Sequence, residues 1–121
     1  MNESAITISV SLYGNIAVKG GGLHVASIKL SLSKGSTIGT VLKELTIKPE
    51  EKGYLFKNAI LFDAPGLNTS LPEILENEDH LGIFSTQHMW PYQYRDGVRM
   101  SESLKEAMKE HGSMSHSYRH Q

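Results

Sequence analysis

The chain has 121 residues, a formal net charge of -1 and 39% hydrophobic residues, which suits one small domain that buries its own core. Cysteine is absent, so disulfides, thiolate metal sites and thiol nucleophiles are excluded. The apolar runs are too short for a membrane span, and the acidic start lacks signal-peptide character, so we expect a cytoplasmic protein without a membrane partner. The balanced charge argues against nucleic acid as a partner, because such binding needs clustered positive charge.

The first two predicted elements are strands joined as a hairpin. Residues 5–13 alternate between hydroxyl and apolar side chains, and the apolar face consists of Ile6, Ile8, Val10 and Leu12. Residues 23–32 repeat this pattern, with the apolar face formed by Ile28, Leu30 and Leu32. The three glycines at 20–22 can supply positive φ angles, so they predict the hairpin turn.

A helix is predicted after the break at Lys34-Gly35. Ser36 or Thr37 can cap it, and the apolar residues recur at i, i+3, i+4 and i+7: Ile38, Val41, Leu42 and Leu45. The later elements are a connection around 49–53, a strand at 58–62, a turn at 63–66, a single helical turn at 71–75 and a last strand at 81–85. The apolar stripe of the helix must lie across the sheet, which predicts an α+β fold of order β-β-α-β-β.

Three segments resemble the MoaD and ThiS family of small sulfur carriers. These are Ser11-Leu12-Tyr13-Gly14 at the end of the first strand, residues 34–42 at the entry to the helix, and residues 75–84 across the acidic turn and last strand. The resemblance covers residues 5 to about 86 and implies a ubiquitin-like β-grasp fold, with a mixed sheet and one packed helix. We therefore expect a β-grasp domain at 1–86 and a C-terminal extension at 87–121.

The family's reactive group is missing from its expected place. Family members carry sulfur on a C-terminal Gly-Gly, whose carboxylate a partner enzyme adenylates and converts to a thiocarboxylate. This sequence ends in Tyr118-Arg119-His120-Gln121, and after Phe84 its glycines, Gly97 and Gly112, are not adjacent. The expectation is therefore the family's fold without its covalent chemistry.

The extension has the composition of a protein interface. Pro91 favours an extended backbone nearby, which would place Trp90, Tyr92 and Tyr94 on one side. Aromatic rings beside an arginine are typical of binding hot spots, which predicts a partner-binding set of Met89, Trp90, Tyr92, Tyr94 and Arg95. The alternative is that these rings cover the domain's own sheet. A helix is also predicted at about 101–111, capped by Ser101 or by Ser103 with Glu106 in a capping box, and ended by Gly112.

No catalytic, cofactor or metal site is predicted. The tail histidines His111, His116 and His120 have neither a regular pair nor a set of acids beside them, so they indicate solvated side chains rather than ligands. His24 and His80 lack an identifiable nucleophile or base partner. The sequence therefore favours a binding protein over an enzyme.

The predicted function is noncovalent protein binding, or an accessory role, in molybdenum or tungsten cofactor (molybdopterin) synthesis or in another sulfur-transfer pathway. The resemblance implies as partner an activating enzyme, a cofactor-synthesis subunit or an oxidoreductase. A homodimer is a further expectation, since the extension could exchange between two chains. Two alternatives remain open: a sulfur carrier that uses an atypical terminus, and an RNA-binding β-grasp module in which Arg95, Arg99 and the aromatic rings stack on bases.

Overall fold

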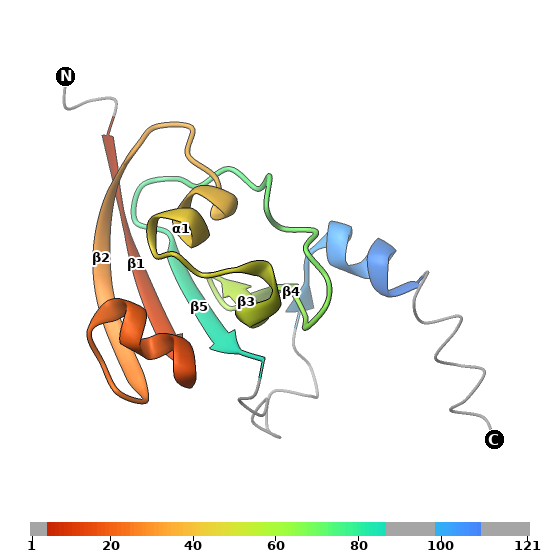
Figure 1. Ribbon diagram of the computed structural model, residues 1–121. Helices are drawn as coiled ribbons and strands as arrows, with labels where there is room; N and C mark the ends of the chain where they lie inside the picture. The colour runs from red at the N-terminus through yellow and green to blue at the C-terminus, as the bar shows by residue number, and fades with distance from the viewer. Residues whose placement is uncertain (1–4, 87–98, 110–121) are drawn as a thin grey trace.

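The computed structural model describes residues 5–86 and 99–109 (Figure 1). Its elements are, in chain order, strand β1 (Ala5–Tyr13), 3-10 helix η2 (Asn15–Gly20), β2 (Val25–Ser33), helix α1 (Ile38–Glu44), 3-10 helix η3 (Pro49–Glu51), β3 (Lys52–Lys57), β4 (Ile60–Asp63), β5 (His80–Ser85) and β6 (Arg99–Met100). A further helix occupies residues 102–109.

The strands form one six-stranded mixed sheet in the order β2-β1-β5-β3-β4-β6. Strand β1 pairs antiparallel with β2 and parallel with β5, while β3 is antiparallel to both β4 and β5. Helix α1 lies across one face of this sheet (Figure 1). The predicted α+β class is therefore confirmed, with a sheet that has more strands than the sequence indicated.

The β1–β2 hairpin pairs without interruption from Ala5↔Ser33 to Tyr13↔Val25, which confirms the predicted pairing. Its connection is longer than the tight glycine turn that the sequence predicted. Helix η2 fills it and buries Ile16 and Ala17, and Gly21 ends that helix with a φ of 87°. Ile16 and Ala17 thus extend the core beyond the paired part of the hairpin. The sequence did not predict this role, because the glycines nearby indicated only a turn.

Helix α1 begins where the capping prediction placed it. The Thr37 hydroxyl accepts a hydrogen bond from the Thr40 N–H at 3.2 Å, and the Thr40 hydroxyl accepts one from the Thr37 N–H at 3.1 Å. The buried face of the helix packs against the apolar faces of the strands in one core cluster. This cluster includes Ile6, Ile8, Val10, Leu12, Ile38, Val41, Leu42, Leu55, Leu81 and Ile83.

Three predictions between residues 49 and 75 differ from the structure. The expected connection around 49–53 instead contains the start of β3, because the Lys52 side chain is buried rather than solvated. The expected helical turn at 71–75 is a turn followed by an extended residue, Ile74, which pairs with Thr37 in an isolated antiparallel bridge. Asn58 and Ala59, predicted as strand, have positive φ angles of 52° and 72° and form the β3–β4 turn.

Residues 99–109 add to the edge of the sheet. Strand β6 pairs parallel with β4 through Ile60↔Arg99 and Leu61↔Met100. Of the two predicted caps the structure shows Ser101, whose hydroxyl accepts a hydrogen bond from the Leu104 N–H at 3.2 Å. The helix itself begins at residue 102. Leu104 is fully buried and anchors the helix. In the described ranges, no helix is long and apolar enough to cross a membrane.

Candidate functional site

The predicted partner-binding residues lie outside the described part of the chain: Met89, Trp90, Tyr92, Tyr94 and Arg95. The tail histidines His111, His116 and His120 also lie outside it. The described residues nevertheless form a polar and aromatic surface on the sheet face opposite α1, and this surface is the candidate site.

A polar patch is formed by Ser9, Ser11, Ser27, Lys29 and His80. The apolar residues of β1 point toward α1, so the alternate residues Ser9 and Ser11 project from the opposite face. The strand register places Lys29 of β2 and His80 of β5 on either side of Ser9, and Ser27 beside Ser11. These five residues line a shallow pocket of about 270 Å³.

The structure gives His80 a partner that sequence reasoning missed. Its Nε2 lies 3.1 Å from the hydroxyl oxygen of Ser11, which is 9% exposed. The two residues are 69 positions apart, and the parallel pairing of β1 with β5 brings them together. The neighbouring Asp79 does not complete a triad, because its carboxylate accepts hydrogen bonds from the Asn58 amide at 2.9 Å and the Glu76 N–H at 2.8 Å. The pair is therefore better suited to binding than to nucleophilic catalysis.

An aromatic cluster of Tyr13, Phe56 and Phe84 adjoins the polar patch. The Tyr13 and Phe84 rings stack with centroids 4.6 Å apart, and Phe56 meets Phe84 edge to face at 5.9 Å. A Cβ atom at Gly82 would lie 4.0 Å from Phe56 Cβ and from the Tyr13 ring, so Gly82 lies between these two side chains with room for a methyl group. Four neighbouring strands, β2, β1, β5 and β3, thus present polar and aromatic groups side by side.

A buried ion pair joins β3 to β4. The Lys52 ammonium lies 3.6 Å from the Asp63 carboxylate and donates to the Leu67 carbonyl at 2.8 Å, and both charged side chains are fully buried. The Asp63 carboxylate also accepts hydrogen bonds from the backbone N–H groups and hydroxyls of Thr69 and Ser70. Burial lowers the pKa of Lys52 below its usual 10.5, although the Asp63 carboxylate acts in the opposite direction.

This arrangement has a structural rather than a catalytic character. It satisfies both buried charges and ties the loop of residues 64–70 to β3. Neither side chain is accessible to a substrate. The pair therefore explains how a lysine can begin an interior strand.

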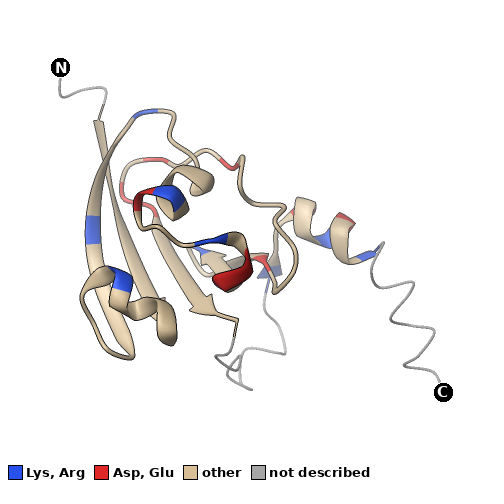
Figure 2. Cartoon of the chain, in the orientation of Figure 1, with Lys and Arg blue, Asp and Glu red and all other residues tan. Residues whose placement is uncertain are grey.

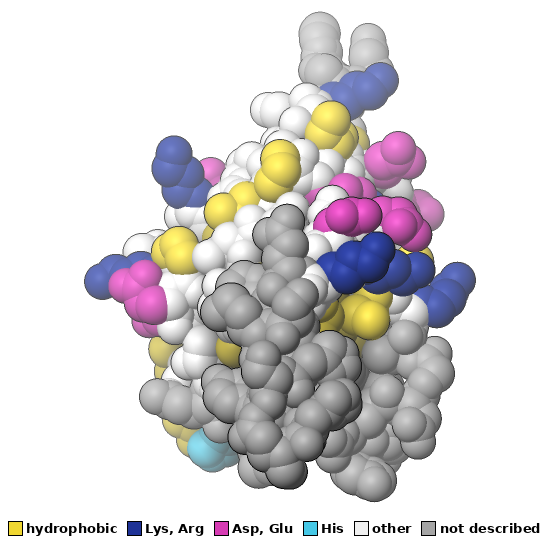
Figure 3. Space-filling model, turned by 90° about the vertical axis from the view of Figure 1, so that its right-hand side faces the viewer, with side chains coloured by type: hydrophobic (Ala, Val, Ile, Leu, Met, Phe, Trp, Pro, Cys, Tyr) yellow, Lys and Arg dark blue, Asp and Glu magenta, His cyan; other side chains and the backbone are white. Residues whose placement is uncertain are grey.

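Charge is spread over the described elements rather than gathered (Figure 2). Lysines lie on η2, β2, α1 and β3, while acidic residues lie on α1, η3 and the segment before β5. On the side that carries the 102–109 helix, hydrophobic, acidic and basic side chains are intermixed (Figure 3). Neither view shows the continuous basic track that a nucleic-acid backbone requires within the described residues.

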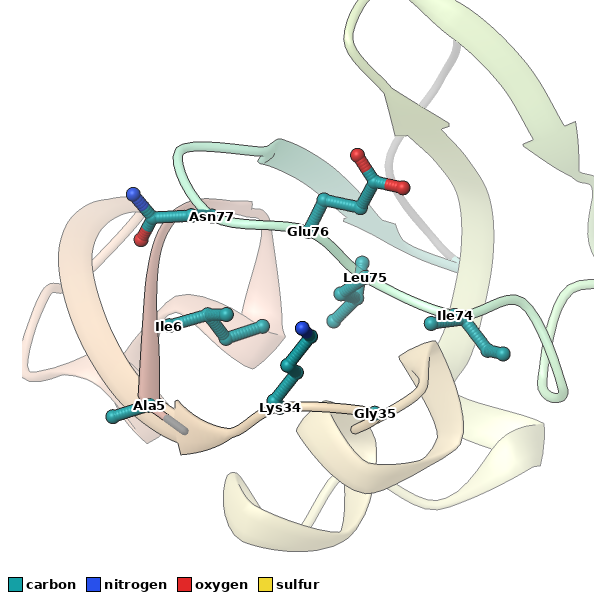
Figure 4. Close-up of a pocket in the computed structure, with 8 residues that line it drawn as sticks. All are labelled: Ala5, Ile6, Lys34, Gly35, Ile74, Leu75, Glu76 and Asn77. Carbon is teal, nitrogen blue, oxygen red and sulfur yellow. The ribbon is translucent and has the colours of Figure 1, made fainter. Parts of the chain in front are cut away.

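A second pocket, of about 610 Å³, lies where β1 begins and β2 ends. Figure 4 shows the Lys34 side chain rising between Ile6 and Leu75, while the side chains of Glu76 and Asn77 point away. Ile6 and Leu75 are 6% and 2% exposed, so they form an apolar floor. The Asn77 amide oxygen accepts a hydrogen bond from the Thr7 N–H at 2.8 Å, which fixes this end of β1. Its apolar floor and single ammonium distinguish this pocket from the hydroxyl-lined polar patch.

Among the described residues, no group of three or more metal-ligating side chains comes together. A comparison with protein-family models finds no matching family, and a comparison with curated proteins finds no significant match. The MoaD and ThiS resemblance therefore stays a prediction.

Proposed function

We propose that this chain is a ubiquitin-like β-grasp protein that binds a protein partner noncovalently through the sheet face opposite α1. The observation that carries the proposal is the strand order β2-β1-β5-β3-β4, with β1 parallel to β5 and α1 between β2 and β3. That order agrees with what the resemblance implies for residues 5–86. The pathway we propose is molybdenum or tungsten cofactor synthesis, or another sulfur-transfer route, and the partner is an activating enzyme, a cofactor-synthesis subunit or an oxidoreductase.

The sheet face supports this proposal by its chemistry. Ser27, Lys29 and His80 are exposed and offer hydrogen-bond donors and a positive charge. The adjoining aromatic cluster adds the partly exposed rings of Tyr13 and Phe56, which the buried Phe84 ring holds in place. A central apolar area beside polar, charged groups is the usual composition of a protein–protein interface.

Calorimetric titration of the full chain against purified activating enzymes and cofactor-synthesis subunits of the family tests the proposal. Lys29→Glu should weaken binding at least tenfold, because it reverses the one lysine charge of the polar patch. Lys43→Glu is the matched control, since Lys43 is exposed on α1, across the sheet. Absence of binding to every candidate, or an equal loss with Lys43→Glu, would contradict the proposal.

Intact mass spectrometry separates noncovalent binding from sulfur carriage. The full chain is incubated with a family activating enzyme, ATP and a sulfur donor. An unchanged mass is expected for a noncovalent module. A gain that corresponds to one oxygen-to-sulfur exchange would instead establish a sulfur carrier with an atypical terminus.

A further inference from the structure

Strand β2 lies at an open edge of the sheet. It ends the strand order β2-β1-β5-β3-β4-β6 and runs along the outer side of the described structure (Figure 1). Its nine residues, Val25–Ser33, pair with β1 along their whole length without a bulge. A long, regular edge strand can hydrogen-bond to a further strand, because half of its backbone groups point away from its neighbour.

The hydrogen bonds around β1 show which groups of β2 point outward. The Gly14 N–H donates to the His24 carbonyl at 2.8 Å, and these two residues continue the register of β1 with β2. Hydrogen-bonded pairs alternate along an antiparallel ladder, so the even-numbered residues of β2 face β1. The other side of β1 agrees, because the Ser9 N–H donates to the Asp79 carbonyl at 3.0 Å, toward β5. The odd-numbered residues of β2 therefore direct their N–H and C=O groups to the open edge.

The open part of this edge is residues 27–31. At one end, Gly22 lies against the Val25 carbonyl, since a Cβ on Gly22 would be 2.1 Å from that oxygen. At the other end, the Ser33 carbonyl accepts a hydrogen bond from the Ser36 N–H at 3.1 Å. Between these ends, no described backbone group outside the sheet bonds to the odd-numbered residues. Three residues therefore offer N–H and C=O groups to an added strand: Ser27, Lys29 and Ser31.

The apolar side chains along the open edge are incompletely covered. Ile28 and Leu30 point to the α1 side and are half-buried, whereas Ala26 and Leu32, next to them on the same side, are buried. Apolar side chains on an added strand would lie beside Ile28 and Leu30 and remove more of their surface from water.

Lys29 determines which charge suits the edge. Its side chain is exposed, and neither β1 nor β2 contains an acidic residue. An acidic side chain directly across from Lys29 on an added strand would form a cross-strand ion pair. A second copy of β2 is a poor occupant, because the antiparallel pairing that aligns all of residues 27–31 sets Lys29 against Lys29.

We propose that the open edge of β2 binds an extended segment of a protein partner, with an acidic residue across from Lys29 and an apolar residue on either side of it. The acidic side chain pairs with the Lys29 ammonium, the apolar side chains cover Ile28 and Leu30, and the backbone of the segment continues the sheet. This inference rests on the proposed function, since it specifies which part of the partner binds and adds the edge of the sheet to its face.

Amide-resolved hydrogen exchange of the full chain, followed by NMR, tests the edge. The probe is the peptide acetyl-Thr-Val-Glu-Val-Thr-amide at millimolar concentration. At saturation it should slow exchange of the Ser27, Lys29 and Ser31 N–H groups by about tenfold, because these groups gain acceptors. The N–H groups of Ile28 and Leu30, which already face β1, should keep their exchange rates.

Three results of this measurement would overturn the proposal. The first is the absence of any saturable effect of the peptide. The second is binding that shifts His80 on the sheet face without protecting the three edge amides. The third is protection of those amides in the free chain, which would show that a second copy or another part of the chain already occupies the edge.

An exchange of charge identifies the contact. Lys29→Glu should weaken the glutamate peptide by about fivefold and should prefer acetyl-Thr-Val-Lys-Val-Thr-amide instead. Lys43→Glu, on the exposed side of α1, should keep the preference for the glutamate peptide. An unaltered preference in Lys29→Glu would contradict the proposed pairing, as would the same change in Lys43→Glu.

A proline tests the backbone contribution. Ser31→Pro removes an outward N–H but no bond to β1, so the folded variant should lose binding of both peptides. Full binding by the folded variant would contradict the proposal, and if Ser31→Pro does not fold, the exchange of charge decides.

This inference and the proposed function fail separately. Binding of a whole partner protein without protection of the Ser27, Lys29 and Ser31 amides would contradict the edge contact alone. Protection by the glutamate peptide, with no binding of any protein of the family, would contradict the proposed choice of partner alone.

Discussion

In the buried pair of Lys52 and Asp63, we predict that loss of the Asp63 side chain lowers the free energy of unfolding more than loss of the Lys52 ammonium does. Asp63→Ala leaves a fully buried ammonium with the Leu67 carbonyl at 2.8 Å as its main acceptor. It also deprives Thr69 and Ser70 of the carboxylate that accepts their N–H and hydroxyl groups. Breaking a buried pair costs about 3 to 5 kcal/mol, and the lost hydrogen bonds place Asp63→Ala at or above the upper end of that range.

Lys52→Met should be milder. Methionine has a similar length and fills the same apolar space, and the Asp63 carboxylate keeps its donors on Thr69 and Ser70. We expect a loss near the lower end of that range, about 3 kcal/mol, in the free energy of unfolding. Since a small domain has only about 5 to 15 kcal/mol in total, Asp63→Ala should approach global unfolding while Lys52→Met stays folded.

Urea denaturation at neutral pH measures both values. Lys105→Met is the control, because Lys105 pairs with Glu102 at 3.4 Å on the surface and its loss should change stability by less than about 1 kcal/mol. The reasoning fails if Lys52→Met destabilises the domain as much as Asp63→Ala does. It also fails if both substitutions are as mild as the control.

Four further predictions follow from single contacts. At pH values between the lowered pKa of Lys52 and 10.5, the unfolded chain binds more protons than the folded chain. The unfolding free energy, compared with that of Lys52→Met, should therefore rise with pH in that window. A fall in this difference, measured by urea denaturation at several pH values, would contradict the prediction. Ser85→Ala should stabilise the domain by about 1 kcal/mol in thermal unfolding, because it removes an unpaired buried hydroxyl, and a lower melting temperature would argue against this account. Thr37→Ala should cost about 1 kcal/mol in urea through loss of the α1 cap, whereas Ser36→Ala, which removes no cap, should cost less. Gly53→Ala should lower the melting temperature, since its Cβ would lie 2.8 Å from the Ser85 carbonyl oxygen, and an unchanged value would show that β3 can shift.

The sequence predicted the elements in which the spacing of apolar residues indicates the buried face. The alternation of Ile6, Ile8, Val10 and Leu12 gave β1 its exact bounds, and the Thr37 cap with its apolar spacing placed α1. It missed β3 because a lysine and a glycine at 52 and 53 are typical of a loop. The Asp63 carboxylate, eleven residues later in the chain, offsets the free-energy cost of burying the Lys52 charge.

The candidate site was less predictable because its contacts cross the sheet. Ser11 and His80 each appear as isolated surface residues in the sequence, and their contact depends on the parallel register of β1 with β5. Likewise, nothing in the local sequence distinguishes Ser85 from a solvated serine. Its unpaired hydroxyl arises from the way η2, η3 and β5 pack together.

Strand β5 contributes to both faces of the sheet, because its alternate residues point to opposite sides. His80 and Phe84 face the polar patch and aromatic cluster, while Ser85 lies on the side of α1. A register shift of one residue would exchange these sides and place Leu81 and Ile83 in water. Asn58 prevents such a shift at the start of β5: its N–H donates to the His80 carbonyl at 2.8 Å, and its side-chain oxygen accepts the His80 N–H at 2.9 Å. The turn residue that sequence reasoning assigned to a strand is thus one of the contacts that hold the candidate site in register.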